Sequence, residues 1–366
     1  MRRQIAIHLL VLCMTGCIDP MPVGSIESEP ALVVDGMITD QPGPYTIRLS
    51  MSTGLAEDIP PQMVGGASMW ILDKAGNTFK LVEKEPGVYV TDPSELRGEI
   101  GKAYSLRFML QDGSEYRSSE EILAPAGVID SVYAVYYENV INQTDLSLPQ
   151  DAITFYVSGR SDPVNSDGLL RWRSSGIYQI LTYPEERTRI IDETRVPDPL
   201  PCSGHINLDG RLVKVDTCSC CNCWVFEYAR QAVVSPARVY NANEFHNVAV
   251  AQVPVDGWRF SHKYYFELEQ LSVSPDVYEF WKRVRAQQQG ARNLFQPNAI
   301  KVKGNLRCVS DPDIEVFGIF AASSITRTTM DVTRAELSRV LPQPERIAAD
   351  CRDVLDNATN VKPPFW

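Results

Sequence analysis

The sequence has no apolar stretch long enough to cross a membrane as a helix. Residues 5–12 (IAIHLLVL) form a short apolar run, far below the roughly 18 residues that a span requires. Basic residues are also scarce, since 35 Lys and Arg stand against 46 Asp and Glu and give a formal net charge of −11. Because an acidic protein gains nothing from approaching a phosphate backbone, we expect no nucleic-acid partner.

Recognisable catalytic motifs are missing from the sequence as well. It contains no Gly-x-Ser-x-Gly and no glycine loop of the phosphate-binding type. After residue 16 the only histidines are His205, His246 and His262, and none lies in a known motif. A pair of glycosidase carboxylates is identified by its separation in space, which a sequence does not give. We therefore predict that the protein is not an enzyme and has no catalytic residue, cofactor or metal.

The N-terminus has the features of a bacterial lipoprotein signal. Arg2 and Arg3 precede the apolar run, and Met14-Thr15-Gly16-Cys17 follows it. Small residues before a cysteine are what a lipoprotein signal peptidase requires. We predict that residues 1–16 are a signal peptide, that Cys17 carries lipid, and that residues 17–30 are a polar tether. Two or more acyl chains give stable anchoring.

Turn residues and alternating apolar residues predict an all-β fold. Pro (25) and Gly (22) are frequent, and helix-period stretches are few. Residues 45–51 and 104–108 alternate apolar and polar side chains, as do other short segments before residue 125. We predict an immunoglobulin-like β-sandwich at 31–125 and a larger β-rich domain at 126–366. Tyr104 is a candidate tyrosine corner, or else a simple core tyrosine.

One helix is predicted in the larger domain, at residues 275–289. Ser274-Pro275-Asp276 supplies an N-cap, a proline in the first turn and an acid at the positive helix end. Val277, Phe280, Trp281 and Val284 share one face, which we expect to be buried across a sheet. A second helix is considered at 334–349, and the terminal Phe365 and Trp366 are expected to pack.

The cysteines predict disulfide bonds. Cys13 is removed with the signal peptide and Cys17 carries lipid, which leaves Cys202, Cys218, Cys220, Cys221, Cys223, Cys308 and Cys351. The spacings within 218–223 are too short for the usual zinc pattern, so disulfides are preferred over a metal site. We expect Cys202 to pair with a member of this cluster and Cys308 to bond Cys351, although sequence does not fix the pairing.

Several segments together resemble a known family. These are residues 34–39 (VDGMIT), 44–50 (PYTIRLS), the Cys223-Trp224 pair, 271–281 (LSVSPDVYEFW), 295–297 (FQP), 302–305 (VKGN), 316–320 (VFGIF) and Ser323-Ser324. In this order they resemble a family of Bacteroidota outer-membrane lipoproteins classed as domain of unknown function 4249. The resemblance implies a lipid-anchored outer-membrane protein, in either leaflet, encoded near TonB-dependent receptors. It names no catalytic residue.

The function predicted from these features is binding rather than catalysis. We expect an accessory lipoprotein that works with a TonB-dependent outer-membrane transporter in nutrient uptake. The alternative is a stand-alone surface protein that binds a glycan or a peptide, with Trp172 and Trp258 as candidate aromatic platforms. An exposed aromatic strip would favour the alternative, and buried tryptophans would favour the accessory function.

Overall fold

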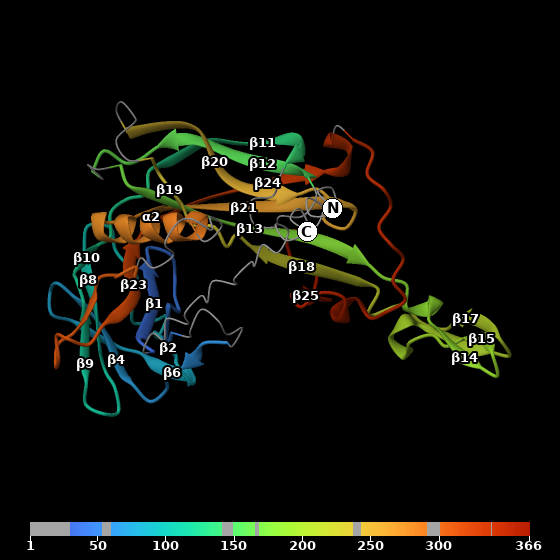
Figure 1. Ribbon diagram of the computed structural model, residues 1–366, viewed down its shortest axis with the longest axis horizontal. Coiled ribbons are helices and arrows are strands. Elements are labelled where there is room, and N and C mark those ends of the chain that lie inside the picture. Colours follow the sequence, from blue (N-terminus) through green and yellow to red (C-terminus); the bar gives the residue numbers. More distant parts are fainter. Residues whose placement is uncertain are drawn as a thin grey trace, which may run out of the picture.

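The computed structural model describes residues 30–52, 60–140, 149–164, 168–236, 243–290, 301–337 and 339–366. The predicted signal peptide, the lipidation site Cys17 and nearly all of the predicted tether lie outside these residues. The described chain is mainly β, as predicted, with several sheets and one α-helix. Figure 1 shows two β bodies side by side, with the helix between them and a slender arm projecting from the far end of the larger body.

The smaller body is a β-sandwich of two six-stranded sheets. Sheet 1 has the order β23-β1-β2-β7-β6, with β3 also paired to β2. Its strands are β1 (Leu32–Thr39), β2 (Thr46–Met51), β3 (Gln62–Met63), β6 (Val82–Glu85), β7 (Val88–Val90) and β23 (Val316–Ser323). Sheet 2 has the order β22-β9-β8-β4-β5, with β10 paired to β8. Its strands are β4 (Ser68–Asp73), β5 (Thr78–Lys80), β8 (Ala103–Met109), β9 (Glu115–Ser118), β10 (Glu121–Ile122) and β22 (Leu306–Cys308).

Alternating side chains build this sandwich in the way the sequence predicts. Every second residue of β2, β4 and β8 is buried, and these residues meet between the sheets in one apolar core. Tyr104 lies in that core, and its hydroxyl accepts a hydrogen bond from the backbone N–H of Glu99 at 2.9 Å. A tyrosine bonded to the backbone a few residues upstream is the arrangement of a tyrosine corner.

Two strands of the sandwich come from much later in the chain than residue 125. β23 pairs in parallel with β1 over all eight residues of both strands, and β22 pairs with β9. Gly318 has a φ of +92° and lies so close to the backbone of Val34 that a Cβ would overlap it. The smaller body is therefore not built from residues 31–125 alone, because residues 306–323 complete one edge of each sheet.

The larger body is a second sandwich with unequal layers. Sheet 3 has the order β11-β12-β20 and contains β11 (Val128–Val140), β12 (Gln150–Arg160) and β20 (Glu244–Pro254). Sheet 4 has the order β24-β21-β13-β18-β25, with β19 also paired to β13. Its strands are β13 (Leu170–Leu181), β18 (Asn222–Tyr228), β19 (Val233–Val234), β21 (Lys263–Ser272), β24 (Ile325–Thr333) and β25 (Ala358–Thr359).

Aromatic side chains join the two layers of the larger body. Phe155 of β12 stacks on Phe266 of β21 with ring centroids 3.8 Å apart. Trp172 of β13 packs edge-on against Phe245 of β20 at 5.1 Å. β20 therefore lies over β13, and β18 and β25 extend sheet 4 beyond the last strand of sheet 3. Among the residues that the structure describes, no strand of sheet 3 covers this part of the inner face of sheet 4.

Helix α2 (Pro275–Gly290) has the predicted position but contacts both bodies. The Ser274 hydroxyl accepts from the N–H of Val277 at 3.3 Å and caps the helix. Val277 and Tyr278 are buried in a cluster with residues of the larger body and of β23. Phe280 and Trp281 are only partly buried, which corrects the expectation that they are core residues. The helix covers the junction of the two bodies.

The C-terminal segment corrects a second expectation. In the described residues of the segment 334–349, the helical structure is limited to a 3-10 turn at Arg334–Glu336, and Pro342 and Pro344 cannot continue a helix. The chain then runs along the larger body to a second 3-10 turn at Cys351–Asp353. Phe365 stacks on Tyr265 at 4.4 Å, so the terminal aromatics do pack. No helix in the described residues is long and apolar enough to cross a membrane.

Candidate functional site: a disulfide-bonded arm and a pair of cavities

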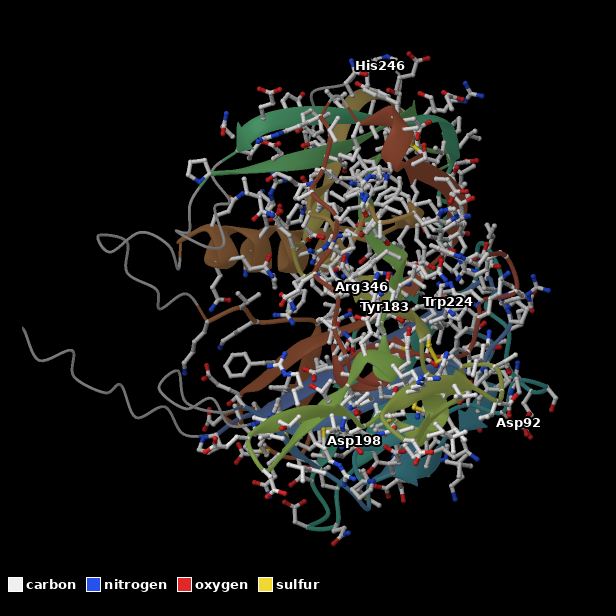
Figure 2. The ribbon with its side chains drawn as sticks, turned by 90° about the vertical axis from the view of Figure 1, so that its right-hand side faces the viewer. Asp92, Tyr183, Asp198, Trp224, His246 and Arg346 are labelled. Carbon is white, nitrogen blue, oxygen red and sulfur yellow. A yellow bond between two sulfur atoms is a disulfide. The ribbon has the colours of Figure 1, made fainter. Side chains whose placement is uncertain are left out.

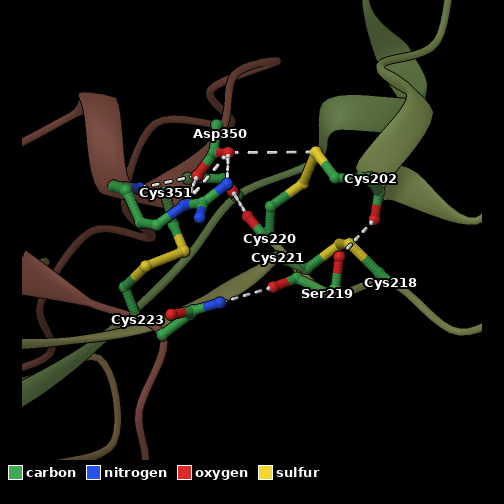
Figure 3. Close-up of polar contacts among 11 residues, drawn as sticks. Cys202, Cys218, Ser219, Cys220, Cys221, Cys223, Asp350 and Cys351 are labelled. Atoms are coloured by element: carbon green, nitrogen blue, oxygen red, sulfur yellow. Dashed lines mark hydrogen bonds and ion pairs between the residues drawn. A yellow bond between two sulfur atoms is a disulfide. The ribbon is translucent and has the colours of Figure 1, made fainter.

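Six of the predicted disulfide cysteines form three bonds at the base of the arm. The bonds are Cys202–Cys220, Cys218–Cys221 and Cys223–Cys351. Figure 3 shows the three bonds close together. Cys202 pairs with a member of the cluster, as predicted. The predicted Cys308–Cys351 bond is wrong: Cys351 bonds Cys223 in the larger body, while Cys308 is a buried free cysteine on β22 of the smaller sandwich.

Three side chains that lie close enough together to hold a metal ion include both cysteines of one of these disulfides. The sulfur atoms of Cys202 and Cys220 lie within 4.8 Å of a carboxylate oxygen of Asp350. Both sulfurs belong to a disulfide, so neither is a thiolate able to bind a metal ion. Asp350 is engaged by Arg352, with Nη2–Oδ2 at 2.5 Å, and this bond together with the Arg352 backbone N–H holds the pKa of Asp350 below its usual range.

The base of the arm is also held by the C-terminal segment. The N–H of Tyr183 donates to the carbonyl of Ile347 at 2.8 Å. The Arg346 guanidinium lies 3.4 Å from the centroid of the Tyr183 ring and forms an ion pair with Glu186. Tyr183 and Arg346 lie side by side in Figure 2. The base is therefore fixed by two disulfides within the arm segment, and by ionic, stacking and backbone contacts with the tail.

The arm itself consists of two hairpins with little core of their own. β14 (Thr188–Ile191) pairs with β15 (Thr194–Pro197), and β16 (His205–Leu208) pairs with β17 (Arg211–Lys214). Short 3-10 turns at Pro184–Glu186 and Pro201–Ser203 lead into the hairpins. The Asn207 side-chain amide donates to the carbonyl of Pro197 at 2.6 Å and joins the two hairpins. Both turns have two residues with positive φ, as hairpin turns require.

Large aliphatic side chains on the arm are exposed to solvent. They are Ile190, Ile191, Ile206, Leu208, Leu212, Val213 and Val215. An isolated two-stranded hairpin is marginally stable in water. Small units without a hydrophobic core therefore depend on covalent cross-links such as disulfides for their stability. A cluster of exposed aliphatic residues, as on this disulfide-bonded arm, is typical of a surface that contacts another molecule.

A second feature lies where β18 passes into β19 beside β13. A bulge at residues 229–232 separates the two strands, although both pair with β13. The Gln288 side chain on α2 holds the bulge, because it accepts from the N–H of Ala232 at 3.0 Å and donates to the carbonyl of Arg230 at 2.9 Å. Cavities lie on both faces of the sheet here, and both are lined by Ser174, Ser175 and residues 228–231.

The cavity on the side of α2, here called the outer cavity, has a volume of about 360 Å³. Its charged lining residues are Arg171, Arg173, Arg230, Glu267 and Glu269, and Trp281 and Tyr228 supply aromatic rings. Arg171 lies over the Trp281 ring at 3.5 Å from its centroid. Burial, with the nearby charge of Arg173, lowers the pKa of Arg171 to about 9.

The cavity between the two sheets, here called the inner cleft, has a volume of about 580 Å³. Glu227 accepts from Arg259 at 2.6 Å and from the Tyr264 hydroxyl at 3.3 Å. Burial and the negative charge of Glu227 raise the pKa of Tyr264, so its hydroxyl stays a neutral donor. Gly176 makes room for this tyrosine, since a Cβ there would overlap the hydroxyl. The cleft is thus polar at one end and lined by Val250, Val253 and Phe266 elsewhere.

The tryptophans named as candidate platforms do not form an exposed strip. Trp172 is 1% exposed, and its indole N–H donates to Gln270 at 3.1 Å inside the core. Trp258 is partly buried against the same core. The aromatic residues that do face outward on sheet 3 are tyrosines: Tyr133 stacks on Tyr156 at 5.3 Å, and the Tyr137 and Tyr156 hydroxyls are 2.8 Å apart.

The described residues form a multi-sheet β protein with a disulfide-bonded arm and two cavities. Residues 18–329 match the family described as domain of unknown function (DUF4249), so the chain belongs to this family. No curated protein matches the chain. The sequence identified the cysteine cluster but gave no indication of the exposed aliphatic arm or of the cavities. The alternation of Leu170-Arg171-Trp172-Arg173 was the available signal, because it places two arginines on one face of a buried strand.

Proposed function

We propose that the protein is a lipid-anchored outer-membrane lipoprotein and a non-enzymatic accessory of a TonB-dependent transporter, which it contacts through the arm. The observation that carries the proposal is the arm with its exposed aliphatic side chains and its disulfide-fixed base. Burying such residues against a partner removes apolar area from water at about 25 cal/mol per Å². A rigid base reduces the loss of conformational entropy on docking, and so lowers the free-energy cost of binding.

The N-terminal sequence supports the same proposal in a second way. Lipid on Cys17 would confine the chain to the membrane that holds the transporter. Confinement raises the effective concentration of the two proteins, so a modest interface suffices for stable contact. The arm lies at the far end of the larger body, away from the smaller one, and so can reach a neighbouring protein without rearrangement of the two β bodies.

The proposal is tested by removing the apolar surface of the arm. Ile190→Asn, Leu208→Asn and Val215→Asn are combined in one variant, since all three side chains are more than half exposed. The matched control combines Val164→Asn, Val340→Asn and Val361→Asn, which are exposed elsewhere. Gentle extraction from native membranes should recover an outer-membrane β-barrel with the wild type and the control, and not with the arm variant. Equal recovery with both variants, or no β-barrel with wild type, contradicts the proposal.

A stand-alone binding protein is the second candidate, and the cavities beside residues 228–231 favour it. Their volumes of about 360 and 580 Å³ lie within the range of small-molecule sites. The two candidate functions predict different results for ligand retention and for the arm variant. A stand-alone binder retains its ligand after purification away from every partner, and its arm variant remains active in the cell. An accessory protein loses its cellular role with the arm.

A further inference from the structure

Arg171 has no acceptor for its N–H groups within the described part of the chain. No hydrogen bond or ion pair reaches its guanidinium, and Nε is buried without a partner. Its neighbour Arg173 differs, because it donates to Glu269 at 2.5 Å, and Glu269 also binds Arg327 at 2.8 Å. Buried charged groups in proteins are as a rule paired. The unpaired guanidinium at the outer cavity is therefore an exception that calls for a partner.

The Trp281 ring compensates the charge of Arg171 only in part. A cation over an aromatic face is attracted by the ring quadrupole, and the 3.5 Å separation is well inside the usual limit of about 6 Å. The ring offers no lone pairs in the plane of the guanidinium, so the buried Nε–H remains without an acceptor. The stacking also fixes the plane of the guanidinium and leaves its edge available for an acceptor.

The other charges of the outer cavity favour a singly charged anion. Glu269 is already shared by two arginines, and Arg230 on the bulge has no ion pair in the described residues. Glu267, which has no ion pair there either, lines the same cavity and opposes the entry of a strongly negative group. The lining residues carry three guanidinium groups and two carboxylates, and the nearby carboxylates of Asp35 and Glu269 attract Arg171 without a hydrogen bond to it.

We propose that the outer cavity binds a small organic ligand through a carboxylate, which the planar fork of Arg171 holds while the body of the ligand lies against Trp281 and Tyr228. A carboxylate matches a guanidinium with two parallel hydrogen bonds. The cavity volume of about 360 Å³ accommodates a ligand of a few residues or one sugar ring. This inference stands apart from the proposed partnership, because it concerns the isolated protein.

Two common sources supply such a carboxylate: the C-terminus of a short peptide and a uronic acid. Isothermal titration of the purified mature chain distinguishes them. The peptide probes are N-acetyl-trialanine as the free acid and as its amide. The sugar probes are glucuronic acid and glucose. We expect one of the acids to bind in a saturable way and its neutral counterpart to bind about ten- to hundredfold more weakly, as the loss of a charge-assisted pair predicts.

Substitution of Arg171 separates a binding role from a structural one. Arg171→Met retains an unbranched aliphatic side chain and removes an unpaired buried charge. The melting temperature of this variant should therefore be equal to or above that of the wild type. Its preference for the acid probe over the neutral probe should be lost. Arg171→Lys keeps the charge without the fork and should bind the acid at least severalfold more weakly. Arg285→Met, at an exposed position of α2, is the control and should bind as the wild type does.

Three results would overturn the inference. One is a wild-type protein that binds neither acid more tightly than its neutral counterpart. The second is an Arg171→Lys protein with unchanged acid binding, because the guanidinium would then not hold the carboxylate. The third is an Arg171→Met protein that melts at a clearly lower temperature, because the guanidinium would then serve the fold.

Discussion

Cys223 of β18 and Cys351 of the C-terminal segment are joined by a disulfide across 128 positions of sequence. The N–H of Cys351 also donates to the carbonyl of Cys220 at 3.0 Å, so the tail is fixed to the strand that follows the arm. Both sulfurs are buried in the core of the larger body. One covalent bond thus links the arm base, sheet 4 and the chain terminus.

This arrangement predicts that the disulfides differ in their contribution to stability. In the chain-entropy account, a bond that closes a 128-residue loop stabilises the fold by about 5 kcal/mol, and one that closes a three-residue loop by about 2 kcal/mol. Cys223→Ala with Cys351→Ala should therefore lower the free energy of unfolding more than Cys218→Ala with Cys221→Ala. Urea unfolding followed by fluorescence measures both. The reverse order would contradict the pairing described here.

Glu121 should make the protein less stable as the pH rises. Its side chain is buried beside Asn305 and Ser119, and burial raises its pKa. A carboxyl group whose pKa is raised on folding is favourable below its unfolded pKa of about 4.3, and this contribution is lost as the pH rises through the folded value. Glu121→Gln should then be at least as stable as wild type at pH 7. Glu120→Gln, at an exposed neighbour, is the control; identical pH profiles for both variants would refute the assignment.

Asp151 should make the protein less stable as the pH falls. It accepts hydrogen bonds from Tyr136, from the N–H of Asn139 and from Arg339, and these bonds lower its pKa. Its contribution is present above the unfolded pKa of about 3.9 and is lost as the pH falls through the folded value. Asp151→Asn should cost stability at pH 7 and progressively less in acid. Asp130→Asn, at a half-exposed carboxylate of β11, serves as the control in the same pH series.

The hydroxyl bonded to Asp151 gives a separate prediction at high pH. Burial and the Asp151 charge raise the pKa of Tyr136 to about 12. The stability this provides is complete below the unfolded value of about 10 and is lost as the pH rises from 10 to about 12. Tyr136→Phe should remove that loss. The ultraviolet absorbance of tyrosinate, recorded with and without the substitution, reports the titration directly, and an unchanged titration curve would be evidence against it.

Trp172 and Trp281 should differ sharply when truncated. Trp172 is 1% exposed and bonded to Gln270, so Trp172→Ala should lower the free energy of unfolding by about 3–5 kcal/mol. Trp281 is only partly buried on α2, so Trp281→Ala should cost less. Chemical denaturation of the two variants compares them. A larger loss for Trp281→Ala would mean that the junction helix, rather than the sheet core, limits stability.

Local patterns in the sequence predicted the local elements. Alternation identified β2 and β8, and Ser274-Pro275 identified the start of α2, because these signals depend on neighbouring residues. The pairing of β23 with β1 depends instead on contacts between residues almost three hundred positions apart, which periodicity does not reveal. The same holds for the bond between Cys223 and Cys351.

The candidate sites were less accessible to sequence reasoning. The sequence showed the cysteines at the base of the arm. Ile206 and Leu208 of β16, however, alternate with polar residues as in a strand with one buried face, and this pattern gave no sign of their exposure. The outer cavity forms because the bulge at 229–232 and α2 meet beside Arg171, and this meeting depends on the tertiary fold.

Site-specific photo-crosslinking in intact cells tests the central claim most directly, namely that the arm contacts an outer-membrane transporter. A photoreactive amino acid replaces Ile190, which is 74% exposed on β14, or Val340, which is 93% exposed outside the arm. After irradiation, mass spectrometry should identify an outer-membrane β-barrel crosslinked through position 190 and not through position 340. If position 190 yields no crosslinked β-barrel, or the same products as position 340, the arm is not the docking element and the account of its function is wrong.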